Sequence, residues 1–247
     1  MKNLVIPKRD RQATQNPLQK IVPDCCIKLI SMERRYSETH KTWNKIAQFF
    51  ENSFMDIKLY DDTYKRFCEL IPKTDASVLE IGCGPGNITR YILELKPELK
   101  ILATDISGNM VDLAKKNNPT SEVRVMDCRN IGTLESVYDA VICGFTIPYL
   151  SEVDCSNLIS DISNLLTKEG VLYLSFVAGH YSSSGYISGS SGDRMYFYYH
   201  DNEKIKKEIE LNSMTIVDIV EKDYKKSDGT FEKHIIINTK KMNNKMD

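Results

Sequence analysis

Three glycines at alternate positions form the part of the sequence with the clearest chemical meaning. Gly82, Gly84 and Gly86 follow the apolar run 78–81, which contains one carboxylate, Glu80. Glycine permits a sharp backbone turn and lets a ligand approach the main chain closely. A buried strand that runs into such a turn and then into a helix is typical of a site for a nucleotide-like ligand.

The spacing within this turn distinguishes two classes of ligand. Dinucleotide-binding turns follow G-x-G-x-x-G and hold a pyrophosphate at the helix N-terminus, but position 87 is Asn and the pattern here is G-x-G-x-G. Glu80 would repel a pyrophosphate and suits a positively charged ligand, such as a sulfonium or an α-amino group. A nucleotide-dependent oxidoreductase is therefore the less favoured alternative.

A second acidic position follows the next apolar run. Asp105 comes directly after the predicted strand 100–104 and lies 19 residues after Gly86. A carboxylate at this place can accept hydrogen bonds from both hydroxyls of a ribose. Asp105 also has a simpler interpretation as a turn residue, because Ser107 is a good N-cap for the helix that follows.

With these residues in place, the segment 78–87 resembles motif I of the class I S-adenosylmethionine-dependent methyltransferases. The resemblance implies S-adenosylmethionine as cofactor, S-adenosylhomocysteine as product and no metal. It implies that Asp127 accepts a hydrogen bond from the adenine amine, beside the backbone N–H of Cys128. Ile106 and Met110 would flank the adenine, although core packing explains them nearly as well. Trp43 would cover the site or simply pack within its helix. The predicted cofactor-binding residues are Glu80, Gly82, Cys83, Gly84, Gly86, Asn87, Asp105, Ile106, Met110, Asp127, Cys128, Gly144 and Trp43.

The acceptor of the methyl group is less clear from the sequence. The chain lacks Asn/Asp-Pro-Pro-Tyr, an acidic metal cluster after the fourth strand and a Pro-Cys dipeptide, which mark three other acceptor classes in such enzymes. A small-molecule acceptor is therefore expected, with nucleic acid disfavoured. The candidate catalytic residues are His180, just past the fifth strand, Arg194, which would suit a carboxylate or phosphate, and Tyr149, after the fourth strand. His234 is expected to be structural, and Tyr60 is a weaker candidate for contact with the methionine end of the cofactor.

The elements that must position these residues alternate between strand and helix. Strands are predicted at 77–81, 100–104, 123–126, 138–143 and 170–177, and helices at 87–95, 109–116 and 152–166. A serine- and glycine-rich loop at 179–192, a helix at 201–211 and two strands at 215–222 and 232–239 follow. This order predicts an α/β fold with a Rossmann-like, seven-stranded, mostly parallel sheet, helices on both faces and a terminal antiparallel strand.

Before the sheet, the sequence predicts two further regions. Residues 1–31 are expected to be a poorly ordered extension, because the first 35 residues carry a net charge of +5 and little apolar periodicity. Residues 32–73 are expected to form an N-terminal helical cap, 74–241 the methyltransferase core and 242–247 a tail. An alternative, suggested by the basic extension, is a catalytically silent methyltransferase-like domain that senses cofactor or binds a partner.

Composition narrows the remaining possibilities. Of the 247 residues, 41% are hydrophobic and 27% are charged, which is ordinary for a globular protein. The net charge of −1 excludes nucleic-acid binding that depends on an overall positive charge. No apolar run reaches 18 residues, so no membrane partner is expected. Seven cysteines without CxxC or zinc spacing predict reduced thiols in the cytoplasm. Oligomeric state cannot be inferred from these features.

Overall fold

The computed structural model describes residues 24–188, 192–226 and 228–242. The helices are α1 (Asp24–Phe54), α2 (Asp61–Leu70), α3 (Asn87–Leu95), α4 (Gly108–Asn117), α5 (Glu152–Leu165) and α6 (Asn202–Leu211), with short 3₁₀ turns η2 (Cys128–Thr133), η3 (Ile147–Tyr149) and η4 (Tyr181–Ser183). The strands are β1 (Ser77–Ile81), β2 (Lys100–Asp105), β3 (Glu122–Val125), β4 (Tyr138–Gly144), β5 (Leu166–Val177), β6 (Gly185–Ser188), β7 (Arg194–Phe197), β8 (Met214–Lys225) and β9 (Phe231–Lys241). Within the described ranges, no helix has both the length and the apolar character needed to cross a bilayer.

Seven strands form the central sheet in the order β3-β2-β1-β4-β5-β9-β8. The first five are parallel to one another, and β9 runs antiparallel between β5 and β8. The order reverses at β1, so the carboxyl ends of β1 and β4 border the crevice in which open α/β sheets bind ligands. The predicted seven-stranded, mostly parallel Rossmann-like sheet is confirmed.

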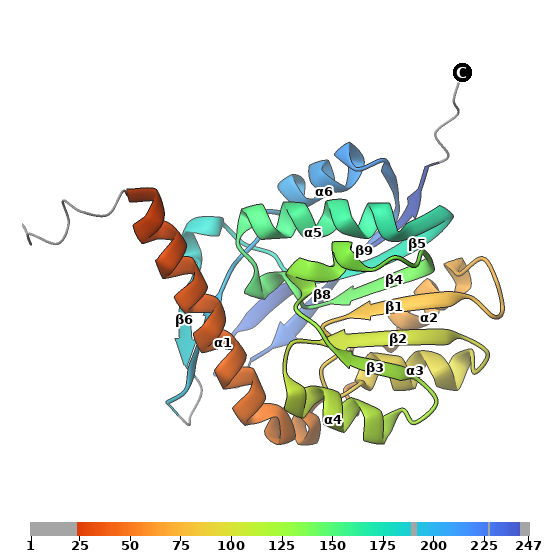
Figure 1. Cartoon of the computed structure of the whole chain (residues 1–247), viewed down its shortest axis with the longest axis horizontal. Helices are drawn as coiled ribbons and strands as arrows, with labels where there is room; N and C mark the ends of the chain where they lie inside the picture. The colour runs from red at the N-terminus through yellow and green to blue at the C-terminus, as the bar shows by residue number, and fades with distance from the viewer. Residues whose placement is uncertain (1–23, 189–191, 227, 243–247) are drawn as a thin grey trace, which may run out of the picture.

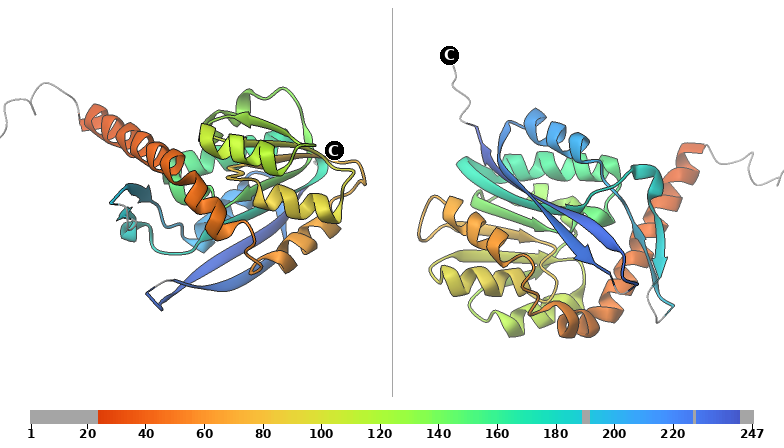
Figure 2. Two further views of the ribbon diagram at one scale, coloured as in Figure 1. Left: turned by 90° about the horizontal axis from the view of Figure 1, so that it is seen from below. Right: turned by 180° about the vertical axis from the view of Figure 1, so that it is seen from behind.

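Both faces of this sheet are covered by helices. Leu79 and Val141 pack with α5 on one face, whereas their neighbours Val78 and Ile142 pack with α2 and α3 on the other. This alternation follows from the two-residue period of a strand, and it explains why β1 and β4 are almost continuously buried. Figure 1 shows α5 and α6 above the sheet with α3 and α4 below, and Figure 2 shows α2 from behind.

Helix α1 is longer than the sequence indicates. It begins at Asp24, so residues 24–31, predicted to belong to a poorly ordered extension, are helical. The physical reason is cooperativity: once the packed part of α1 has formed, each added residue costs much less than helix nucleation. The rest of the predicted extension, residues 1–23, lies outside the described residues, as do residues 243–247 of the predicted tail.

The segment predicted as a serine- and glycine-rich loop also contains regular structure. Within 179–192, η4 is followed by β6, and β6 pairs antiparallel with β7. This hairpin docks on α1, where Thr42 Oγ1 donates to the carbonyl of Arg194 at 2.6 Å and Tyr196 N–H donates to Thr39 Oγ1 at 2.9 Å. The contacts of β7 with α1 therefore stabilise its partner β6, which lies in a segment whose composition alone favours a loop.

Candidate functional site

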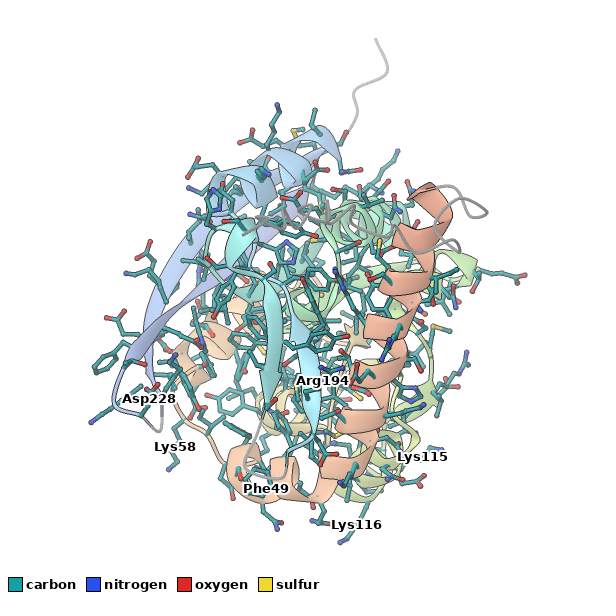
Figure 3. All side chains as sticks on the ribbon, turned by 90° about the vertical axis from the view of Figure 1, so that its left-hand side faces the viewer. Phe49, Lys58, Lys115, Lys116, Arg194 and Asp228 are labelled. Atoms are coloured by element: carbon teal, nitrogen blue, oxygen red, sulfur yellow. The ribbon has the colours of Figure 1, made fainter. Side chains whose placement is uncertain are left out.

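A cavity of about 520 Å³ lies at the carboxyl ends of the parallel strands. Its walls come from α1, the loops after β1 to β4, the β6–β7 hairpin and the adjacent ends of β8 and β9. Figure 3 looks onto this end of the molecule and shows α1 and the hairpin, which carries Arg194, in front of the sheet. The helix and the hairpin thus form the outer wall of the cavity, which limits access of water to the strand ends.

The glycine turn forms the floor of the cavity. Gly82 and Gly84 have φ of +69° and +55°, in the left-handed region that favours glycine. A Cβ at Gly82 would lie 2.2 Å from Thr146 Oγ1, which itself donates to the carbonyl of Ile81 at 2.8 Å. A Cβ at Gly84 would meet only Phe50 at 3.8 Å, so the backbone at this glycine is open toward the cavity.

Asp105 stands beside the turn with its carboxylate held by two backbone groups. Gly84 N–H donates to Oδ2 at 2.9 Å, and Ser107 N–H donates to Oδ1 at 2.8 Å. Burial raises the pKa of Asp105 above its usual range, and these two hydrogen bonds oppose the shift. Each carboxylate oxygen can still accept a further hydrogen bond, so the group is oriented to receive two donors from a ligand. Ser107 is also the N-cap of α4, as predicted.

Asp127 lies farther along the same wall and is paired with Arg129. The guanidinium donates to the carboxylate through Nε and Nη2, at 3.0 and 2.7 Å from Oδ2. Burial opposes ionisation, but the hydrogen bonds from Arg129 outweigh it and lower the pKa of Asp127. Arg129 also contacts Glu33 at 3.0 Å and lies over the ring of Tyr36. The sequence interpretation missed this ion pair, although the two residues are separated by only one position.

Glu80 does not line the cavity, in contrast to the prediction that it contacts the cofactor. The side chain is 1% exposed beneath the turn, and Thr89 donates a hydrogen bond to its Oε2. Its Oε1 has no hydrogen-bond partner among the described residues. Burial raises the pKa of Glu80 to about 8, so this group is mostly protonated at neutral pH. Because side chains alternate along β1, Glu80 lies on the same face as Val78 and points toward α3, which carries Thr89.

The structure brings most of the other predicted cofactor residues together. The predicted residues that line the cavity are Trp43, Gly82, Cys83, Gly84, Asn87, Asp105, Ile106, Met110, Asp127, Cys128, Gly144 and Tyr149. Gly86 is outside the lining because it is the residue before α3, where its carbonyl accepts from Asn118 Nδ2 at 3.0 Å. The shared location supports one binding site, while the contact made by each residue stays a prediction.

Two of the three candidate catalytic residues lie outside the cavity. His180 is exposed and caps η4, with Nδ1 at 2.6 Å from Ser182 Oγ. Arg194 pairs with Glu38 of α1 and lies over the ring of Tyr186. On β7, Met195 and Phe197 face the cavity, so the two-residue period turns Arg194 away from it. The catalytic roles of His180 and Arg194 stay predictions that this geometry does not favour, and of the three residues only Tyr149 lies in the lining.

The far end of the cavity contains polar residues that the sequence interpretation did not favour. Tyr60, which precedes α2, and His234 of β9 are both in the lining, and Tyr60 Oη lies 2.7 Å from His234 Nδ1. Tyr224 of β8 stacks on His234 with ring centroids 4.9 Å apart. Glu232 completes the group, with Oε2 at 4.0 Å from His234 Nε2. Because Tyr60 and His234 are 174 positions apart, no local motif could have revealed their contact.

Known proteins match the sequence over its central part. Residues 78–170 match a family model described as a methyltransferase domain. A tRNA N(3)-methylcytidine methyltransferase of Schizosaccharomyces pombe is 32% identical over 111 residues, covering 44% of this chain and 45% of that protein. A malonyl-[acyl-carrier protein] O-methyltransferase of Acetivibrio thermocellus is 25% identical over 152 residues, covering 61% of this chain and 49% of the relative. The chain spans about half the length of these curated relatives or less.

Solved structures share the fold over more of the chain. A 1,6-didemethyltoxoflavin-N1-methyltransferase of Burkholderia thailandensis superimposes with a TM-score of 0.63 at 13% identity, covering 84% of this chain and 88% of that one. An S-adenosylmethionine-dependent methyltransferase of Clostridium acetobutylicum gives a TM-score of 0.62 at 17% identity, covering 82% of this chain and all of that one. With the sheet order, these matches show that the chain has the fold of S-adenosylmethionine-dependent methyltransferases, and residues 78–170 match the methyltransferase domain family.

Proposed function

We propose that this protein is an S-adenosylmethionine-dependent methyltransferase that acts on a small-molecule acceptor in the cytoplasm. The observation that carries the proposal is Asp105, whose carboxylate is oriented toward the cavity by the N–H groups of Gly84 and Ser107. This arrangement suits a ribose that offers two hydroxyl donors to one carboxylate. The structure with S-adenosylhomocysteine of the toxoflavin methyltransferase supports this choice of ligand by analogy of fold.

The residues around the cavity fit the other parts of S-adenosylmethionine. The open backbone at Gly84 leaves room for the methionine portion above the turn, and Asp127 and the backbone of Cys128 are available to the adenine. Arg129 would keep Asp127 ionised as a hydrogen-bond acceptor. The bound sulfonium supplies an already activated methyl group, so the protein mainly has to position the acceptor and exclude water.

A small acceptor is favoured by the walls of the cavity. Within the described lining, Arg129 is the one residue with a permanent positive charge, and it is already paired with Asp127 and Glu33. An acceptor that carries phosphates would therefore find no free cation inside the cavity. The curated relatives do not indicate one class of acceptor, since their names refer to tRNA, malonyl-[acyl-carrier protein] and demethylmenaquinone. A reducing compartment suits the free cysteines, of which Cys83 and Cys128 lie in the lining.

Calorimetry with S-adenosylmethionine and S-adenosylhomocysteine tests the cofactor assignment, and a metabolite extract incubated with labelled S-adenosylmethionine tests the activity. We expect both ligands to bind and a methylated product to be identified by mass. Lack of binding of either ligand at millimolar concentrations would refute the cofactor assignment. Binding without any methylated product would instead favour the catalytically silent domain.

A further inference from the structure

The part of the cavity beyond Phe145 has no role in the cofactor site described above. Asp105 ends β2, whereas His234 lies near the start of β9, opposite Val177 at the end of β5. Four strand intervals separate β2 from β9, which amounts to about 19 Å at the usual strand spacing. Phe145 follows β4 and its ring lies 4.9 Å from that of His234. The His234 end is thus on the far side of the place where β1 and β4 would hold the methionine portion.

Three polar groups at this end form a chain. Tyr60 and His234 are only 5% and 6% exposed, and Tyr60 Oη is 2.7 Å from His234 Nδ1. His234 Nε2 faces Glu232, so the Nε2–H tautomer leaves Nδ1 free to accept from the tyrosine. Burial lowers the pKa of His234, and the neighbouring Glu232 opposes this shift. The imidazole is therefore neutral at neutral pH and can take up a proton.

Aromatic side chains surround Tyr60, His234 and Glu232. The ring of Phe145 lies 5.2 Å from that of Tyr60, and the ring of Tyr224 stacks on that of His234. Lys226 approaches Glu232 at 3.3 Å but is not part of the lining, so no described cation is directed into this end. Flat uncharged molecules pack well against such rings, whereas an anionic ligand would be desolvated without a partner.

We propose that this end of the cavity binds the methyl acceptor, an uncharged aromatic compound with an ionisable O–H or N–H, and that Tyr60 relays its proton to His234. The proposal rests on the proposed function, because it needs a methyl donor in the cofactor site. It assigns a ligand class and a proton path to residues that the sequence interpretation treated as structural or of minor interest.

The proposed path accounts for the proton that the acceptor loses when it gains the methyl group. The acceptor's lone pair forms the new bond to the methyl carbon, and the electrons of the breaking carbon–sulfur bond remain on sulfur. The acceptor's proton passes to Tyr60 Oη while the tyrosine proton passes to His234 Nδ1. Burial raises the pKa of Tyr60, so a tyrosine that receives one proton as it gives up another avoids a buried phenolate. Glu232 stabilises the resulting imidazolium, which then loses its proton to solvent.

Binding is tested first, with two probes that differ in charge. Full-length protein saturated with S-adenosylhomocysteine is titrated with 2-naphthol and with 2-naphthoate in a calorimeter. We expect 2-naphthol to bind at least ten times more tightly, and to be methylated when S-adenosylmethionine replaces the product. Equal or tighter binding of 2-naphthoate would overturn the proposed ligand class.

Substitutions then test the proton path. Tyr60→Phe should lower kcat for 2-naphthol by about 100-fold, while the Kd for S-adenosylhomocysteine stays within twofold. Tyr91→Phe, which removes the same hydroxyl from a tyrosine outside the lining, is the matched control and should leave kcat unchanged. A Tyr60→Phe variant with wild-type kcat would overturn the relay.

The dependence of kcat on pH distinguishes a role of His234 in proton transfer from a role in packing alone. The groups that face His234 are Tyr60, Tyr224 and Glu232, and Lys222 opposite it on β8 is paired with Asp62. Because the pKa of His234 is lowered, wild-type kcat should fall only at a pH below the ordinary His value of about 6.5, and His234→Gln should lose this acidic limb. An unchanged limb would refute the role of His234. Failure of S-adenosylmethionine to bind refutes the proposed function itself, whereas binding of S-adenosylmethionine without methylation of 2-naphthol refutes only this inference.

Discussion

The two ends of the cavity are built in different ways. At the end formed by β1, β2 and β3, the wall consists of three short loops, and backbone N–H groups orient Asp105. At the end formed by β8 and β9, side chains from four separate elements meet: Tyr60, Phe145, Tyr224 and His234. The first end depends on local backbone conformation and the second on long-range packing. This difference explains why a cofactor can be inferred from spacing while an acceptor cannot.

The two ends also differ in charge. The carboxylates of Asp105 and Asp127 face the first end, whereas the second end presents a neutral histidine, tyrosines and Glu232, whose charge is balanced by Lys226 at 3.3 Å. Acidic groups suit a cofactor with hydroxyl, amine and sulfonium groups, and the neutral end suits an uncharged acceptor. If this contrast is correct, substitutions at the first end should alter stability or cofactor affinity, and those at the second end should alter turnover.

The largest effect is expected from Glu80→Gln. The folded-state pKa of Glu80 is about 8, above its ordinary value of 4.5, so stability should be highest below pH 4.5 and fall as pH rises toward 8. Glutamine removes the buried charge, so the variant should lose this decline and gain on the order of 4 kcal/mol relative to wild type at pH 9. Urea unfolding at pH 5 and pH 9 measures the difference. The exposed control Glu98→Gln should keep the wild-type pH dependence, and a Glu80→Gln protein that still shows it would contradict the assignment.

The glycine turn provides the next largest effect. Gly82→Ala should destabilise the fold by about 3 kcal/mol, since it combines left-handed strain with a clash that displaces Thr146 from its hydrogen bond to Ile81. Gly108→Ala is the matched control, because no atom lies within 4 Å of its Cβ position. Chemical denaturation of both variants checks the prediction. Equal stability of the two would show that the turn is not conformationally restricted.

Asp105→Ala tests the cofactor end directly. It should weaken binding of S-adenosylhomocysteine by roughly 1.5–3 kcal/mol, or about 10- to 150-fold, through loss of charge-assisted hydrogen bonds. Asp112→Ala, on the exposed side of α4, should bind with wild-type affinity. Titration calorimetry measures both, and an unchanged dissociation constant for Asp105→Ala would show that this carboxylate does not contact the ribose.

The smallest effects are expected outside the cavity. Arg194→Met and His180→Ala should each leave kcat within twofold of wild type and shift Tm by no more than about 2 °C, since both side chains are at the surface. Thermal denaturation and steady-state assays with the identified acceptor check this. A large loss of kcat in either variant would mean that the β6–β7 hairpin takes a different position during catalysis.

Much of the fold could be predicted because its strands are short apolar runs bounded by turn residues. The elements from β1 to α5 begin and end within a few residues of their predicted positions, and the glycine turn lies where a buried strand meets a helix. Strand β6 was missed because serine and glycine disfavour strands, and its pairing with β7, which is bound to Thr39 and Thr42 of α1, overcomes that preference. Glu80 was placed in the site by its position before the glycine turn and Arg194 by its residue type, whereas the strand period directs both away from the cavity.

The sequence by itself determined the order of strands and helices, the glycine turn, the acidic residue that ends β2 and the acidic residue that follows β3. These features depend on contacts between near neighbours in the chain, so residue type and spacing specify them. Only the tertiary structure decided which polar side chains face the cavity and which serve packing or surface ion pairs. Tyr60 and His234 are separated by 174 positions and meet because β9 inserts beside β5 and α2 packs on the same face of the sheet. Such a contact depends on topology, which no local pattern encodes.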